Sequence, residues 1–251
     1  MFTHPPGPSA GQVATLTLNT YAPQAVRQGL SRMGSDHEHL RQVPGLQFYR
    51  LLGTGRGSTL TLSADLRRWA RFAVWSSADA LEAFEASGWR AQERAGAAES
   101  CTAVLRPLRW RGRWGGAEPF EGPPARTADP GGPVAVLTRA AIRPTRLLRF
   151  WRAVPASQRH LDSQPGLLAA VGIGEVPLVH QATFSVWRSA QAMKAFAYGG
   201  AAHREVIART HREGWYSEEL FARFAVLDIR GRWGGRDLLG ESGLAAPPTH
   251  L

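Results

Sequence analysis

The histidines in the second half of the chain are the side chains best suited to bind a metal ion. His203 shares a helix face with Val206 and Ile207, because residues three and four positions apart lie on one side of a helix. An imidazole so placed is a buried structural residue, a surface residue or a metal ligand, and the pattern alone does not separate these roles. His211, about two helical turns further along, is the alternative ligand.

Several other cofactor sites lack the residues that they need. The sequence has no His-x-x-x-His or Glu-x-x-His pattern for zinc or di-iron chemistry. Cys101 is the only cysteine, which excludes an intrachain disulfide and a cysteine-ligated cluster, and its strand-like surroundings predict a buried thiol. The glycine-rich stretch Gly53–Gly57 does not open directly into a helix, as a dinucleotide site requires. We therefore expect a tight turn there.

The net charge of +10 comes almost entirely from arginine, since Lys194 is the only lysine. The arginines are interleaved with acids and form no long run, so we expect no nucleic-acid binding. A basic face suits an acidic redox partner or an anionic membrane surface instead. No apolar stretch approaches the roughly 20 residues of a membrane helix, and the N-terminus lacks the features of a signal peptide. We expect a cytoplasmic protein, with membrane association and oligomerisation left open.

The elements that position these residues come from a duplicated unit. Val13–Thr17 recurs 121 residues later as Val134–Thr138, and Arg111–Gly116 recurs 119 residues later as Arg230–Gly235. Between them, Arg71–Trp75 is matched 112 residues later by Thr183–Trp187. Such self-similarity indicates one supersecondary unit present twice.

Each copy predicts the order strand, helix, strand, strand, helix, strand, which is the ferredoxin-like split βαββαβ pattern. We expect an α+β protein whose two sheets close into a barrel like that of the dimeric α+β proteins, with a cavity between sheet and helices. The expected regions are an N-terminal tail (1–11), a first repeat (12–116), a linker (117–133), a second repeat that holds the functional site (134–236) and a loosely ordered C-terminal tail (237–251). The expected strands are Val13–Thr20, Leu46–Leu52, Trp69–Trp75, Cys101–Trp110, Val134–Ile142, Leu167–Ile173, Val179–Trp187 and Leu220–Ile229, and the expected helices are Ala25–Leu40, one capped by Ser76 or Ser77, Thr145–Leu161 and Ser189–Glu213.

The two copies differ in the length of their second helix. The distance from Trp187 to Trp233 is 46 residues, against 39 from Trp75 to Trp114. His203 falls in this longer segment and aligns with Ala91, so the first copy has no equivalent imidazole. The difference predicts that function has specialised in the second copy.

The second copy resembles the spheroidene monooxygenase family of carotenoid ketolases. The resemblance rests on three stretches, Gly172–Pro177 with Gln181–Trp187, Ala195–Tyr198 with His203, and Gly214–Phe224. Leu51–Gly57 and Arg68–Trp75 of the first copy are similar to the same family, and the match runs from about Val13 to Trp233.

The resemblance implies a haem enzyme that oxygenates acyclic carotenoids next to the end group, using dioxygen and electrons from a ferredoxin. Two hydroxylations at one carbon would give a gem-diol that loses water to a ketone. On this basis we expect His203 to be the axial ligand of a b-type haem. Arg204 and Arg223, with Arg209, are the candidates for binding the propionates, and Phe184 and Phe196, with Val186, Phe221 and Phe224, are the candidate apolar walls. The alternatives are a haem-binding or haem-degrading barrel and a cofactor-free monooxygenase.

Overall fold

The computed structural model describes residues 11–56, 63–122, 131–158, 161, 163–176, 178–199, 209–210, 212–240 and 243. Its strands are β1 (Val13–Thr20), β2 (Leu46–Gly55), β3 (Ala64–Trp75), β4 (Glu99–Gly112), β5 (Val134–Ile142), β6 (Leu167–Gly174), β7 (His180–Trp187) and β8 (Tyr216–Gly231). Its helices are α1 (Val26–Leu40), α2 (Ala78–Glu85), α3 (Gly88–Gly96), α4 (Leu147–Gln158) and α5 (Ala190–Gly199). Single 3-10 turns at Pro23–Ala25 and Pro144–Arg146 lead into α1 and α4.

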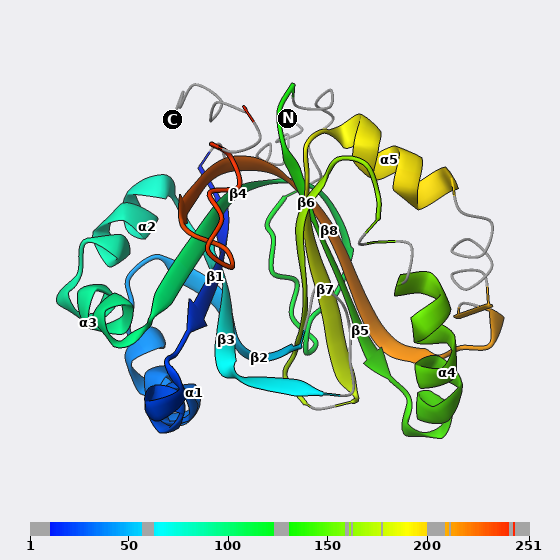
Figure 1. Ribbon diagram of the computed structural model, residues 1–251, viewed down its shortest axis with the longest axis horizontal. Helices are drawn as coiled ribbons and strands as arrows, with labels where there is room; N and C mark the ends of the chain where they lie inside the picture. Colours follow the sequence, from blue (N-terminus) through cyan, green and yellow to red (C-terminus); the bar gives the residue numbers. More distant parts are fainter. Residues whose placement is uncertain are drawn as a thin grey trace, which may run out of the picture.

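The eight strands form one closed antiparallel barrel in the order β1-β3-β2-β6-β7-β5-β8-β4 (Figure 1). Each copy contributes four adjacent strands in the ferredoxin-like order, and helices α1 to α3 and α4 to α5 lie outside the barrel on opposite sides. This confirms the predicted α+β fold. Closure leaves no free sheet edge, which protects the strands from pairing with other chains.

The two seams between the copies are unequal. At one seam β4 pairs with β8 from Cys101–Gly231 to Gly112–Leu220, whereas at the other β2 and β6 pair only through Gly53–Gly174 and Thr54–Ile173. Gly53 and Gly55 therefore lie in a strand at a barrel seam, so the expected tight turn is wrong for this part of the stretch, and Gly57 lies outside the described residues. The backbone amides of a nucleotide-binding loop must be free to bind phosphate, whereas the backbone of Gly53 and Thr54 is paired with β6.

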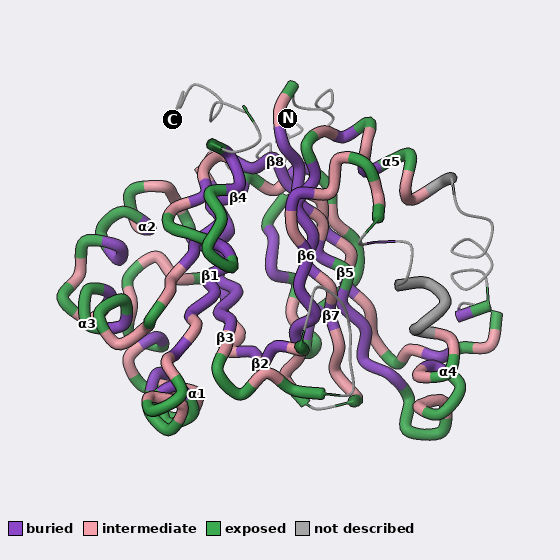
Figure 2. Tube along the Cα trace, viewed as in Figure 1, coloured by how far each residue is buried: buried purple, intermediate pink, exposed green. Residues whose placement is uncertain are grey.

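The barrel interior is a packed apolar core. Its aromatic residues include Phe72, Phe184 and Phe224, all fully buried, and Trp114 stacks on Phe72 with ring centroids 5.4 Å apart. Figure 2 shows the buried positions gathered along the barrel strands. Apolar side chains from both copies therefore occupy the barrel interior.

Two segments expected to lie outside the core contribute to it. Phe120, in the predicted linker, is buried among Phe72 and Phe224, and Leu238 and Leu239 of the predicted tail pack in the same core. The free energy gained by burying these large apolar side chains exceeds the conformational entropy that the connection loses when it is ordered. The linker and tail are therefore partly barrel structure.

The repeated Arg-Gly-Arg-Trp-Gly-Gly motif joins the two copies reciprocally. The amides of Gly115 and Gly116 donate 2.7 and 2.6 Å hydrogen bonds to the carboxylate of Glu218, which belongs to the other copy. The amides of Gly234 and Gly235 bind Glu99 in the same way, at 2.7 and 2.6 Å. All four glycines have positive φ, which turns consecutive amides toward one anion.

The observed helices differ from the predicted ones mainly in the first copy, where one predicted helix is broken in two. The second helix of the first copy divides into α2 and α3, because Ser77 and Ser87 each cap a helix by accepting a hydrogen bond from a backbone amide three residues on. In the second copy α5 ends at Gly199, and residues 200–208 and 211 of the expected long helix lie outside the described part of the chain.

Candidate functional site

The space between sheet and helices is filled with charged side chains in the first copy. Arg71 of β3 donates to Glu93 of α3 at 2.5 Å, and Arg90 of α3 donates to the other carboxylate oxygen of Glu93 at 2.7 Å. Arg90 also pairs with Glu85 at 3.0 Å and donates to Thr102 of β4 at 2.9 Å. We call these five residues the first-copy network.

The network is buried and internally neutralised. Arg71 and Arg90 are 3% and 1% exposed, and Glu93 is 3% exposed. Burial alone would raise the pKa of Glu93, but the adjacent guanidinium groups of Arg71 and Arg90 outweigh it and hold that pKa below its usual value. Burial also lowers the pKa of Arg90 to about 10. The side chains occupy the volume where a ligand would otherwise lie between helix and sheet.

The second copy has no such network at the matching strand positions. Thr17 of β1 lies between Arg71 and Thr102 in the sheet register, and the matching position Thr138 of β5 lies between Thr183 and Phe221. Thr17 is 1% exposed, whereas Thr138 is exposed. Thr183 therefore stands where the first copy has the guanidinium of Arg71, and among the described residues no arginine–glutamate network covers this outer face.

This outer face is the best candidate for a functional site. We call it the second-copy face and define it by Val136 and Thr138 of β5, Thr183 of β7, and Phe221 and Arg223 of β8. Arg223 is paired with Val136 in the register, and all but Thr138 are half-buried. The face is apolar along its middle with a guanidinium at one side, which suits a flat apolar group with an anionic edge.

Helices α4 and α5 lie at opposite ends of this side of the barrel (Figure 1). Phe150 of α4 is anchored with Ile142 and Trp215, and Phe196 of α5 stacks on Trp187 with ring centroids 5.2 Å apart. The second-copy face therefore lies between two separately anchored helices.

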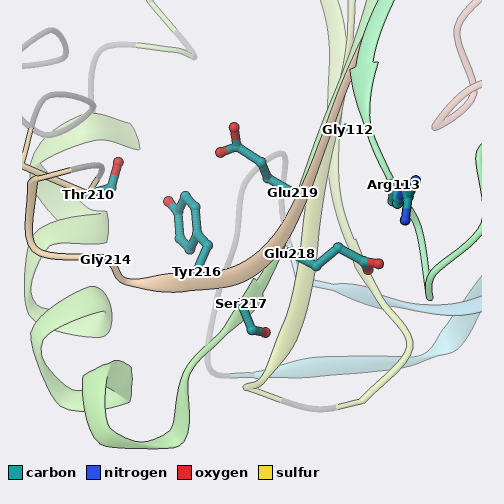
Figure 3. A pocket seen from close by; sticks show the side chains of 8 residues that line it. All are labelled: Gly112, Arg113, Thr210, Gly214, Tyr216, Ser217, Glu218 and Glu219. Atoms are coloured by element: carbon teal, nitrogen blue, oxygen red, sulfur yellow. The ribbon is translucent and has the colours of Figure 1, made fainter.

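A pocket of about 460 Å³ adjoins the start of β8 (Figure 3). Its side chains are polar, and burial raises the pKa of Tyr216 there to about 12. Its lining residues are Gly112, Arg113, Thr210, Gly214, Tyr216, Ser217, Glu218 and Glu219. Of its two carboxylates, that of Glu218 is bound by the amides of Gly115 and Gly116 and by Arg139.

The structure separates the predicted site residues. Phe184 lies in the barrel core, where it stacks on Trp233, so it is on the opposite face of the sheet from Phe196. Of the expected set, Arg223 borders the second-copy face and Phe196 belongs to the helix cluster beside it. His203, Arg204 and His211 lie outside the described residues, so their roles stay predictions.

The first copy shows what the repeat implies for position 203. Ala91, which aligns with His203, is exposed on α3, whereas Arg90 and Glu93 point toward the sheet. An unchanged helix register would thus turn position 203 outward. The prediction that His203 faces a cavity therefore depends on the seven additional residues of the second copy, 46 against 39 between the tryptophans.

The histidines and the cysteine of the described residues have contacts of their own; His180, at the start of β7, lies 3.7 Å from the carboxylate of Glu175. No group of three or more His, Cys, Asp or Glu residues within them is arranged to hold a metal ion. Burial raises the pKa of the Cys101 thiol to about 12, so it is not a thiolate ligand. His37 is hydrogen-bonded to Tyr49 at 3.1 Å, and His39 stacks on Trp89 at 4.7 Å. Both imidazoles belong to the first copy and have structural contacts.

Comparisons with known proteins identify relatives of this chain by sequence and by fold. No protein-family model matches the chain. The chain is 38% identical over 213 residues to the spheroidene monooxygenase of Rhodobacter capsulatus, covering 84% of this chain and 88% of the relative. It is 38% identical over 235 residues to that of Rubrivivax gelatinosus, covering 93% and 90%.

Solved structures of aldoxime dehydratases share the fold. One aligns with a TM-score of 0.61 at 14% identity, over 92% of this chain and 88% of that one. Another, in complex with butyraldoxime, aligns with a TM-score of 0.64 at 9% identity, over 94% and 89%. At these identities the likeness concerns the barrel and its helices. No helix within the described ranges combines the length and apolarity needed to span a membrane.

Proposed function

Because the chain belongs to the spheroidene monooxygenase family, we propose that it inserts oxygen from dioxygen into an apolar polyene such as an acyclic carotenoid. Hydroxylation of one carbon and loss of water after a second hydroxylation would give a ketone. The observation that carries the proposal is the difference between the copies: an arginine–glutamate network fills the first-copy space, whereas the described residues place no such network over the second-copy face.

The side chains of the second-copy face support a b-type haem as the cofactor. Small side chains at Thr138 and Thr183 leave room for a flat ring, and Arg223 offers a cation for a propionate. We propose that the imidazole of His203 would bind the haem iron and that Arg204 would pair with a propionate. Haem, when bound, supplies the activation of dioxygen that the protein side chains lack. Phe221 and Phe196 would exclude water and orient the polyene beside it.

We propose that the two electrons needed for each inserted oxygen atom come from a ferredoxin-type protein. The sequence has no dinucleotide fingerprint with the required strand–turn–helix context. Strand β4 supports an acidic partner, because Arg106, Arg109 and Arg111 project from its outer face and are exposed. No carboxylate of the described residues lies within ion-pairing distance of Arg106 or Arg109, and Arg109 is paired with Arg223 in the sheet register.

The defining experiment is product analysis with an acyclic carotenoid, reduced ferredoxin and ¹⁸O₂. The proposal requires a hydroxylated or ketone product that carries ¹⁸O, which is identified by mass spectrometry. Formation of biliverdin and free iron would instead show that haem is the substrate. Turnover without any haem absorption would show a cofactor-free monooxygenase.

Two variants test the location of the site. Thr138→Trp should fill the second-copy face and lower kcat/KM at least tenfold, because an indole cannot share that space with a flat ligand. Thr145→Trp, at an exposed position before α4, is the matched control and should leave kcat/KM within twofold. Equal effects of the two substitutions would contradict this location.

A matched pair of charge reversals tests the electron donor. R106E/R109E should slow ferredoxin-dependent turnover about tenfold at low salt, with a smaller effect at high salt. R27E/R41E changes the net charge equally at exposed arginines of the first copy and should have less than a threefold effect. The same slowing in both variants would show that only net charge matters.

A further inference from the structure

Helix α4 presents apolar side chains to solvent as well as to the protein. Phe150, on its inner side, is buried against Trp215, but Leu148 is 63% exposed. The aligned position in α1 is Arg27, a residue that an ordinary solvent-facing helix would carry. Exposed leucines are common singly, so the surroundings of Leu148 decide whether its exposure has a function.

The turn between β6 and β7 extends the apolar surface of α4. Leu178 is 42% exposed and Val176 is 44% exposed. The indole of Trp151 donates a 3.2 Å hydrogen bond to the carbonyl of Leu178, which joins this turn to the helix one turn after Leu148. Leu178 also has a φ of 69°, the only positive φ of a non-glycine residue among the described positions. An apolar side chain is thus held outward at a conformational cost.

Arginines on α4 and directly before it flank Leu148 in the chain. Arg143 and Arg152 are exposed and have no carboxylate of the described residues within ion-pairing distance, and Arg149 is exposed beside them with Glu213 as its partner. An apolar patch with tryptophan at its edge and arginines around it has the composition of a surface that inserts shallowly into anionic bilayers. The exposed leucines and valine distinguish this surface from the arginines of β4, since an acidic protein partner needs the charge but not the apolar side chains.

We propose that Leu148, Val176 and Leu178, flanked by Arg143 and Arg152, form a membrane-docking surface that binds anionic phospholipid bilayers. This inference rests on the proposed function for its purpose, because an acyclic polyene dissolves in the bilayer and α4 borders the second-copy face. Docking would place the second-copy face next to the lipid phase and let the polyene move without crossing water.

The test is cosedimentation of the full chain with vesicles of phosphatidylglycerol and phosphatidylcholine. L148Q/L178N should lower the vesicle-bound partition coefficient at least tenfold, since two leucines no longer enter the interface; asparagine tolerates positive φ at position 178. L30Q/L66N is the matched control, because Leu30 and Leu66 are 56% and 57% exposed in the first copy. It should change the coefficient less than twofold.

The charge requirement is tested separately. R143Q/R152Q should weaken binding to the anionic vesicles several-fold and leave the small binding to pure phosphatidylcholine unchanged, whereas R27Q/R41Q should affect neither. Equal loss in L148Q/L178N and L30Q/L66N would overturn the proposal. So would a dimer in sedimentation that L148Q/L178N dissociates, since the surface would then bind a second copy.

Turnover in two media separates this proposal from the proposed function. L148Q/L178N should oxidise carotenoid in detergent micelles at the wild-type rate and lose at least tenfold with carotenoid in anionic vesicles. Wild-type rates in both media would overturn the docking surface and keep the monooxygenase. Vesicle binding with no oxidation in either medium would contradict the proposed function alone.

Discussion

Replacing Glu93 with glutamine should strongly destabilise the first copy without affecting the functional site. Glu93 is the carboxylate shared by Arg71 and Arg90, which are 3% and 1% exposed. Arg90 retains Glu85 after the change, but Arg71 loses its carboxylate partner. Breaking a buried pair on one side costs about 3 to 5 kcal/mol, because a charge remains buried without compensation. In a chain of this size that loss lowers Tm by roughly 6 to 20 °C.

The assay is urea unfolding followed by far-UV circular dichroism and tryptophan fluorescence, at pH 7. Glu82→Gln is the matched control, since Glu82 pairs with Arg230 at 2.5 Å but is 52% exposed, and it should cost less than about 1 kcal/mol. A loss of less than 1 kcal/mol in E93Q would refute the reasoning. It would mean that water or side-chain movement compensates Arg71 as well as the carboxylate does.

The remaining predictions concern pH, the interface between copies and the thiol. The pKa of Glu93 in the folded protein lies below its usual 4.5, so the stabilisation by the Glu93 carboxylate is complete above about pH 5 and is lost as pH falls through the folded pKa. The difference in unfolding free energy between wild type and E93Q should therefore shrink on acidification. A constant difference in urea titrations down to pH 3 would contradict this. Glu218→Gln should cost about 1 to 3 kcal/mol in the same assay, because one oxygen that accepts from Gly115 or Gly116 is lost, and an unchanged free energy of unfolding would disprove the reciprocal contact. With its pKa raised to about 12, the buried Cys101 thiol should react with a disulfide reagent at pH 8 only as fast as the barrel opens, and rapid labelling of the folded protein would refute its burial.

The barrel was predictable from sequence because duplication supplies its own comparison. Alternation in Val13–Thr17 and Val134–Thr138 defines matching strands, and the ferredoxin-like order then fixes which strands are neighbours. The error at Gly53 has a local cause. A glycine-rich stretch is typical of a turn, and only the pairing with Gly174 across the two copies makes it a strand.

The second-copy face was not predictable in the same way. Thr138, Thr183 and Phe221 are far apart in sequence, and their shared surface depends on the register of three strands. The arginines of β4 were missed for a similar reason, since inward Leu108 and Trp110 interrupt them in sequence. Leu148 has the residue type of a core position, and only its exposure distinguishes it. The second-copy face, the arginines of β4 and the exposure of Leu148 all depend on the direction of a side chain relative to the core, which the residue type alone does not give.

Haem ligation by His203 is the central claim, and the absorption spectrum of purified His203→Ala tests it most directly. The protein should be expressed with haem supplied, with His211→Ala as the control and circular dichroism to confirm the fold. We predict that H203A loses the Soret band while H211A keeps it at wild-type position and intensity. A folded H203A with an unchanged Soret band would contradict the claim, and loss of the band in H211A alone would assign the iron to His211.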